Sequence, residues 1–217
     1  MKETLNKYGV AIIPNLLNDS ECDNMNNGMW DTLETITNKW STPINRGDNK
    51  TWRDISKLYP IHSMLLQHWQ IGHSQYIWDL RQNPKIVDIF SNLWNCQNED
   101  LLVSFDGVSY HMPPEITKRG WYRKKDWLHC DQCFQNSDFN CVQSWVTAND
   151  INEGDATLTF LEGSNNFHKD CYIDCNIDCK KNWYKLTEKE LLFYKDKKCS
   201  LKKIKCPKGS MVLWDSR

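Results

Sequence analysis

Two residues in the stretch WLHCDQ have the types and the spacing that could hold a metal ion. His129 and Asp131 are two positions apart, so on an extended strand their side chains leave the same face. An imidazole and a carboxylate on one face are two of the three ligands in the facial triad that binds iron(II) and leaves coordination positions open. The spacing therefore predicts that His129 and Asp131 are catalytic residues and metal ligands.

A second pair with the same spacing, His168 and Asp170, shows that the motif is not specific by itself. His129 and Asp131 follow Trp127 in an apolar run and precede the β-like CVQSWV, whereas His168 follows the turn-rich EGSNNF. Strand geometry is therefore expected for the first pair and not for the second. The alternative for the first pair is a half-buried, hydrogen-bonded histidine with a carboxylate at the surface.

Cysteines offer another use for the same segment, a structural zinc site with the ligands His129, Cys130, Cys133 and Cys141. Only one C-x-x-C pair is present, and strand alternation would point Cys130 away from His129. Three further cysteines recur at four-residue intervals, Cys171, Cys175 and Cys179. This spacing would align them on one helical face, where packing is the expected role.

The strand that must position His129 and Asp131 belongs to a β-rich second half of the chain. From residue 101 onward, short apolar or alternating runs are separated by Gly, Pro, Asn and Asp: LLVSFDGVSY, WLHCD, CVQSWVTAND, ATLTFL and SMVLWDS. Short strands without helical crossovers between them indicate an antiparallel sandwich or barrel. We therefore expect a β core over residues 100–217.

The first part of the chain, residues 1–99, is predicted to be largely helical. An apolar run of strand length, Tyr8–Ile13, precedes Asn18, which offers an N-cap for an amphipathic helix. Asn83 and Pro84 place a cap and an N1 proline ahead of apolar residues at helical spacing up to Trp94. A chain of 217 residues suits one core, so the expected fold class is a single α+β domain over residues 1–217, mainly β with flanking helices.

Composition bounds the partners. With 27 basic and 28 acidic residues the formal charge is −1, which favours neither nucleic acid nor an anionic membrane as a partner. The N-terminal apolar run is too short for a signal sequence or a membrane span. Ten cysteines are scattered without the dense framework of a small secreted scaffold. We therefore expect a cytoplasmic protein with reduced thiols.

The order of these segments resembles the phytanoyl-CoA dioxygenase family. The resemblance spans nearly the whole chain and rests on GVAIIPNLL, WDLRQNPKIVDIFSNLW, LLVSFDGVSY, HCD, VQSWVTAND, LTFLEGSNNFH and KGSMVLWDSR. It implies a double-stranded β-helix (jelly-roll) with helices packed on one sheet. It also implies iron(II), 2-oxoglutarate as cosubstrate, O2, and the oxidation of an unactivated C–H bond in a small molecule.

Carried over residue by residue, the resemblance makes His129 and Asp131 the first two iron ligands and places Trp145 in the 2-oxoglutarate pocket. Gln143 shares the parity of Trp145 and is expected to contact cosubstrate or substrate. The strand beside the cosubstrate would present Ser104, Asp106 and Val108. Two arginines, Arg53 and Arg81, are candidates for carboxylate contacts.

The chain departs from the family pattern at its end. The third ligand is a histidine shortly after the strand that corresponds to Gly209–Trp214, and the arginine that binds the far carboxylate of 2-oxoglutarate lies further on, but the sequence stops at Arg217. A truncated sequence is the expected reason. Replacement of the ligand by His168, or of the arginine by Arg217, is the alternative. A catalytically inactive jelly-roll that binds a ligand or partner is the rival function.

Basic residues hint at the charge of the substrate, whose identity the sequence does not reveal. Two segments, residues 118–125 (KRGWYRKK) and the lysine-rich 180–208, would attract an anion if they bordered a cleft. The alternative is that both are solvated surfaces. In the first segment the prediction falls on Arg119, Arg123, Lys124 and Lys125.

Overall fold

The computed structural model describes residues 1–58, 65–118 and 127–217, and the chain divides into two compact units. The sheet unit comprises Met1–Leu17 and Lys124–Arg217, and the helical unit comprises Asn18–Arg123. The N-terminal strand belongs with the second half of the chain because it pairs with the last strand.

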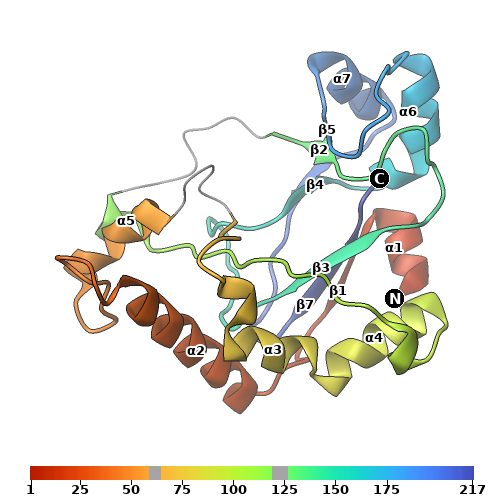
Figure 1. The fold of residues 1–217 in the computed structure, drawn as a ribbon. Helices are drawn as coiled ribbons and strands as arrows, with labels where there is room; N and C mark the ends of the chain where they lie inside the picture. The colour runs from red at the N-terminus through yellow and green to blue at the C-terminus, as the bar shows by residue number, and fades with distance from the viewer. Residues whose placement is uncertain (59–64, 119–126) are drawn as a thin grey trace. The chain divides into compact units, whose positions relative to one another are not determined.

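The sheet unit is built on a three-stranded antiparallel sheet in the order β1 (Val10–Ile13), β7 (Met211–Asp215) and β3 (Val142–Val146) (Figure 1). Strand β7 is central, with Leu213 opposite both Ala11 and Ser144. Residues 211–213 of this central strand are fully buried. These three strands were predicted from short apolar or alternating runs, and the prediction is confirmed.

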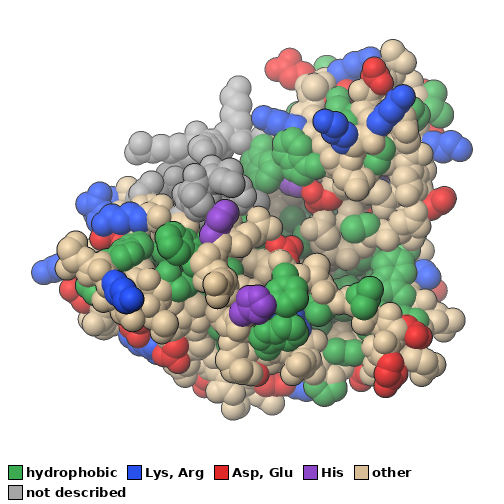
Figure 2. Space-filling model, viewed as in Figure 1, with side chains coloured by type: hydrophobic (Ala, Val, Ile, Leu, Met, Phe, Trp, Pro, Cys, Tyr) green, Lys and Arg blue, Asp and Glu red, His purple; other side chains and the backbone are tan. Residues whose placement is uncertain are grey.

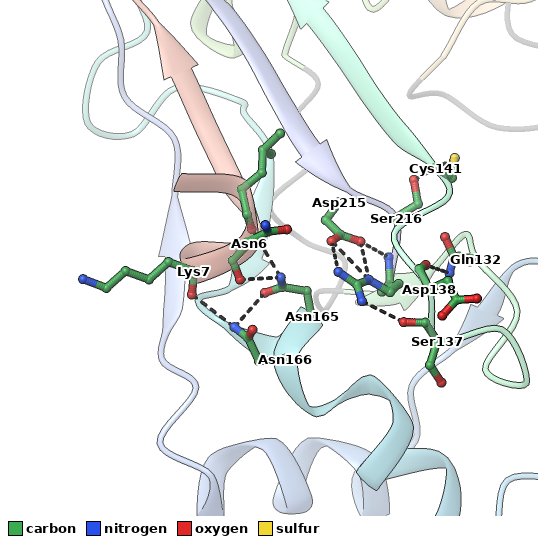
Figure 3. Close-up of polar contacts among 12 residues, drawn as sticks. Asn6, Lys7, Gln132, Ser137, Asp138, Cys141, Asn165, Asn166, Asp215 and Ser216 are labelled. Atoms are coloured by element: carbon green, nitrogen blue, oxygen red, sulfur yellow. Dashed lines mark hydrogen bonds and ion pairs between the residues drawn. The ribbon is translucent and has the colours of Figure 1, made fainter. Parts of the chain in front are cut away.

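Two short antiparallel ribbons complete the strands of the sheet unit. They are β2 (His129–Cys130) with β5 (Tyr184–Lys185), and β4 (Thr159–Leu161) with β6 (Leu201–Lys203). The helices of this unit are α1 (Lys2–Tyr8), η4 (Ser164–Phe167), α6 (His168–Asp174) and α7 (Glu188–Asp196). Helix α1 is tied to η4, because the Asn165 side chain donates to the carbonyls of Leu5 and Asn6 and the Asn166 side chain donates to that of Lys7 (Figure 3).

The described residues of the helical unit form helices and turns, and none of them lies in a ladder of strands. Its elements are α2 (Asp19–Thr37), η1 (Asn49–Leu58), η2 (Ile71–His73), α3 (Gln75–Arg81), α4 (Pro84–Trp94), η3 (Asn98–Asp100) and α5 (Pro114–Thr117). Both helices predicted from caps are confirmed. Asn18 and Glu21 form a complete capping box for α2, and the Asn83 side chain accepts from the Lys85 amide at the start of α4.

Helix exceeds strand, at 41% against 15%. The fold is therefore α+β with small antiparallel sheets, and the expectation of a mainly β chain is not met. The largest difference is the run Leu101–Tyr110, which was expected to be a strand; among the described residues its pairing is limited to one bridge, Val108 with Leu66. The Asp106 carbonyl accepts from the Arg81 guanidinium (3.1 Å), so this backbone group is bound by a side chain.

The surface carries mixed charge. Basic and acidic side chains are interspersed on the face seen in Figure 2, consistent with the formal charge of −1. Among the helices of the described ranges, none has the length and apolar character that crossing a membrane requires.

Candidate metal centre

The β2–β5 ribbon separates an inward and an outward row of side chains by simple alternation. The inward row belongs to a buried cluster of the sheet unit and comprises Leu128, Cys130, Tyr184 and Leu186. The outward row comprises Trp127, His129, Asp131, Trp183 and Lys185. The backbone continues the ribbon beyond the strand residues, since the Leu186 amide donates to the Leu128 carbonyl and the Trp183 amide donates to the Asp131 carbonyl. Alternation therefore places both predicted ligands on the same face.

His129 and Asp131 converge. His129 Nε2 lies 3.6 Å from Asp131 Oδ1, and both side chains are partly exposed, at 25% and 35%. Two donors that each lie about 2.1 Å from one ion, at about 90–120° to each other, are about 3.0–3.6 Å apart. The two atoms are therefore spaced as neighbouring ligands of a single metal ion would be.

The main chain and a tryptophan hold the imidazole of His129. Its Nδ1 lies 3.1 Å from the Trp127 carbonyl, which can only accept, so Nδ1 carries a proton. The Trp127 ring stacks on the imidazole at 4.5 Å and 9°. Burial alone would lower the pKa of His129, but the Asp131 carboxylate and the Trp127 carbonyl raise it above its ordinary value. A metal ion would replace the second proton, at Nε2.

The carboxylate of Asp131 is oriented from another strand. Gln143 of β3 donates from Nε2 to Asp131 Oδ2 at 2.6 Å, which leaves Oδ1 toward His129. Burial by itself would raise the pKa of Asp131, but His129 and Gln143 lower it below its ordinary value. An amide that fixes one carboxylate oxygen and leaves the other for the ion is a typical supporting contact at metal sites. Gln143, predicted to contact cosubstrate or substrate, contacts a predicted ligand in this structure.

The segment after β7 supports the same two residues. The Ser216 carbonyl accepts from the amides of Asp131 (3.0 Å) and Gln132 (2.9 Å), and the Ser216 hydroxyl lies 3.1 Å from Gln143 Nε2. Next to it, the Asp215 carboxylate is bound by the Arg217 guanidinium, which also donates to the Ser137 carbonyl (Figure 3). Arg217 is thus paired with Asp215, two residues before it in the chain.

A third protein ligand is not found in the part of the chain that the structure describes, where no three His, Cys, Asp or Glu side chains gather as a metal site. His168 does not replace it. It begins α6, is 1% exposed and stacks on Phe134 at 4.3 Å. The expectation that the His168–Asp170 pair lacks strand geometry is confirmed.

The cysteines do not form the alternative zinc site within the described ranges. Cys130 points into the core at 5% exposure, opposite to His129, and burial raises the pKa of its thiol above the ordinary value. Cys141 is exposed. Cys171 and Cys175 lie in the same buried cluster with their sulfurs 4.0 Å apart, and partly buried Cys179 packs against that cluster. The predicted packing role is therefore confirmed for all three, although α6 ends at Asp174, so Cys175 and Cys179 follow the helix.

The remaining residues predicted to contact the cosubstrate are divided between the two units. Trp145 lies on β3 and packs with the buried cluster around Val212. The helical unit contains Ser104, Asp106, Val108 and Arg53.

Two of these positions have structural roles, as does Arg81. Asp106 Oδ1 accepts from the Gln67 side chain, and Val108 pairs with Leu66. Arg81 lies over the rings of Trp78 and Phe105 and donates to two backbone carbonyls. Arg53 is exposed on η1. The basic residues Arg119, Arg123, Lys124 and Lys125 lie outside the described residues.

Sequence reasoning missed the residues that surround His129 and Asp131. Trp127 could have been found, because it has the same parity as His129 and Asp131. Trp183, Lys185 and Ser216 could not, since they reach the site only through the pairing of β2 with β5 and the position of β7.

Comparison with known proteins shows similarity to a distant relative. No protein-family model matches the chain. The protein named "Ava biosynthesis cluster protein O" from Aspergillus versicolor is 26% identical over 163 residues, which cover 69% of this chain and 49% of the relative. The chain thus spans about half the length of that relative.

Proposed function

We propose that this protein is an iron(II)- and 2-oxoglutarate-dependent oxygenase that oxidises a small molecule. The observation that carries the proposal is the 3.6 Å separation of His129 Nε2 and Asp131 Oδ1 on the outward face of the β2–β5 ribbon. Nitrogen and carboxylate ligands with open positions beside them are typical of non-haem iron(II) oxygenases. We also propose that the antiparallel strands belong to a jelly-roll, the fold that such a site would require.

His129 would bind iron through Nε2 and Asp131 through Oδ1. Iron, when bound with 2-oxoglutarate, supplies the activation of O2 that no side chain provides. The Trp127 carbonyl accepts a hydrogen bond from His129 Nδ1 and thereby fixes the tautomer of the imidazole. Gln143 keeps one carboxylate oxygen away from the ion. Both contacts hold the ligands ready before the metal binds, which favours binding.

The rest of the site is proposed from the resemblance. A histidine that follows Arg217 would be the third ligand, and Trp145 would line the cosubstrate pocket. Ser104, Asp106 and Val108 would flank the cosubstrate.

The relative's name suggests the setting. It places that protein in a biosynthesis cluster, and we propose that the present chain also acts in the biosynthesis of a small molecule.

Metal binding by the full-length protein tests the proposal. The protein is loaded anaerobically with iron(II) and desalted, bound iron is quantified, and succinate release from 2-oxoglutarate is measured. We expect one iron per chain and succinate formation, both lost in His129→Ala and Asp131→Ala. Asp170→Ala is the matched control, because Asp170 belongs to the second His-x-Asp pair and is exposed. Equal loss in Asp170→Ala, or full iron binding by Asp131→Ala, would contradict the proposal.

A second candidate is a binding protein of the same fold without catalysis. It is favoured by one observation, that the described residues gather two potential ligands and not three. The experiment above separates the two. Full-length protein that binds neither iron nor 2-oxoglutarate supports the binding protein, whereas iron-dependent succinate release excludes it.

A further inference from the structure

The outward face of the β2–β5 ribbon carries more than the two proposed ligands. Trp127 and Trp183 are 39% and 50% exposed, and their ring centroids are 6.4 Å apart. Trp183 also lies 5.7 Å from the ring of His129. Large aromatic rings left in water are unfavourable unless something covers them. Two exposed rings beside His129 and Asp131 indicate a surface that binds a flat molecule.

The backbone of Trp183 strengthens this interpretation. Its φ of 66° lies in the left-handed region, which is uncommon for a bulky residue and is often found at functional sites. The conformation is held by the Trp183 amide, which donates to the Asp131 carbonyl at 3.2 Å. The exposed ring is therefore tied by the main chain to one of the proposed ligands.

A cation lies on the same face. Lys185 is the direct cross-strand partner of His129, and directly paired residues in an antiparallel ribbon project to the same side. Lys185 is exposed, and within the described ranges no carboxylate lies within ion-pair distance of it. The face thus combines stacking rings with an exposed ammonium group.

We propose that this face binds the substrate, and that the substrate is a flat ring system bearing a carboxylate. Trp183 and Trp127 would contact the ring, and Lys185 would pair with the carboxylate. The ring would then lie next to His129 and Asp131. The oxidation of that ring or its substituents rests on the proposed oxygenase function. The binding of the ring does not require the metal and can be measured without it.

The test uses 2-naphthoate as the probe, with the full-length, metal-free protein and ligand-observed NMR titration. We expect Trp183→Ala to weaken binding at least about fivefold, as for loss of a stacking partner. Lys185→Gln should weaken it about threefold, as for one exposed ion pair, and should leave binding of the uncharged 2-naphthamide unchanged. Trp69→Ala is the matched control, because Trp69 is equally exposed, at 51%, and belongs to the helical unit.

Trp127 is kept intact in these variants, since its removal would also free the imidazole of His129. Binding of 2-naphthoate that is absent, or equal in wild type, Trp183→Ala and Lys185→Gln, overturns the inference even if iron binds normally. Binding that both variants weaken supports it. If the same preparation then fails to bind iron, only the oxygenase proposal falls.

Discussion

Lowering the pH should destabilise the protein through His168. Its imidazole is 1% exposed and stacked on Phe134. Burial, with the Arg217 guanidinium nearby, lowers its pKa to about 4, and the nearby Gln132 backbone and Asp215 carboxylate offset only part of this. In the unfolded chain the same group titrates near its ordinary value of 6.5. Between these two values the unfolded state binds a proton that the folded state does not.

The sign and size follow from this difference. Above about pH 7, His168 is neutral in both states and contributes no pH dependence. As the pH falls through 6.5, the unfolded state gains protons, so the free energy of unfolding decreases by up to about 1.4 kcal/mol for each pH unit until about pH 4. Between pH 7 and pH 5 the expected loss from this one group is about 2 kcal/mol.

The matched variant is His168→Phe, which keeps an aromatic ring against Phe134 and cannot take up a proton. Urea unfolding at pH 7, 6 and 5 gives the free energy of unfolding of both proteins. The other titrating groups are shared, so the difference in pH dependence isolates His168. We expect wild type to lose about 2 kcal/mol more than the variant. Equal pH dependence of the two, or an imidazole NMR signal of His168 that titrates above pH 6 in the folded protein, would refute the reasoning.

Three other predictions concern the proposed metal ligands, a helix cap and the thiols. Gln143→Leu should weaken iron(II) binding about tenfold or more without unfolding the protein, because Asp131 loses the amide that orients it; equal affinity by metal titration would show that the contact is dispensable. Asn18→Ala should lower the free energy of unfolding by about 1 kcal/mol, since it removes the side chain that caps α2, and urea unfolding measures this. Alkylation at pH 8 followed by mass spectrometry should modify exposed Cys141 well before buried Cys130, whose thiol pKa is raised by burial; the reverse order would contradict the described burial.

The sequence predicted the helices and strands that are determined by residues close to them in the chain. The helix α4 begins at Pro84 because Asn83 caps it, and both residues are readable without a structure. The run Leu101–Tyr110 has the apolar alternation of a strand, yet Arg81, distant in sequence, takes up the Asp106 carbonyl. Alternation shows which residues could face a core, but not whether a neighbouring strand will be present to pair with them.

The same limit explains what could be predicted of the site. His129 lies in β2 and Asp131 directly follows the strand, so the period of two was enough to place them on one face. Lys185 reaches that face through β5, a strand of two residues with no signal of its own. Ser216 arrives from the end of β7. Contacts of this kind depend on which strands pair, and a single sequence does not specify the pairing.

The two His-x-Asp pairs show why backbone geometry, and not the motif, makes the site. His168 and Asp170 have the same spacing but lie at the start of α6, where residues two apart do not face each other. His129 lies in β2 and Asp131 directly follows it, and this arrangement brings nitrogen and oxygen to 3.6 Å from each other. A change that broke the β2–β5 pairing should therefore abolish metal binding with both ligands still present. Tyr184→Pro is such a change, because proline cannot donate to the ladder; Lys202→Pro on the other ribbon is the control, and equal iron binding by wild type and Tyr184→Pro would contradict the argument.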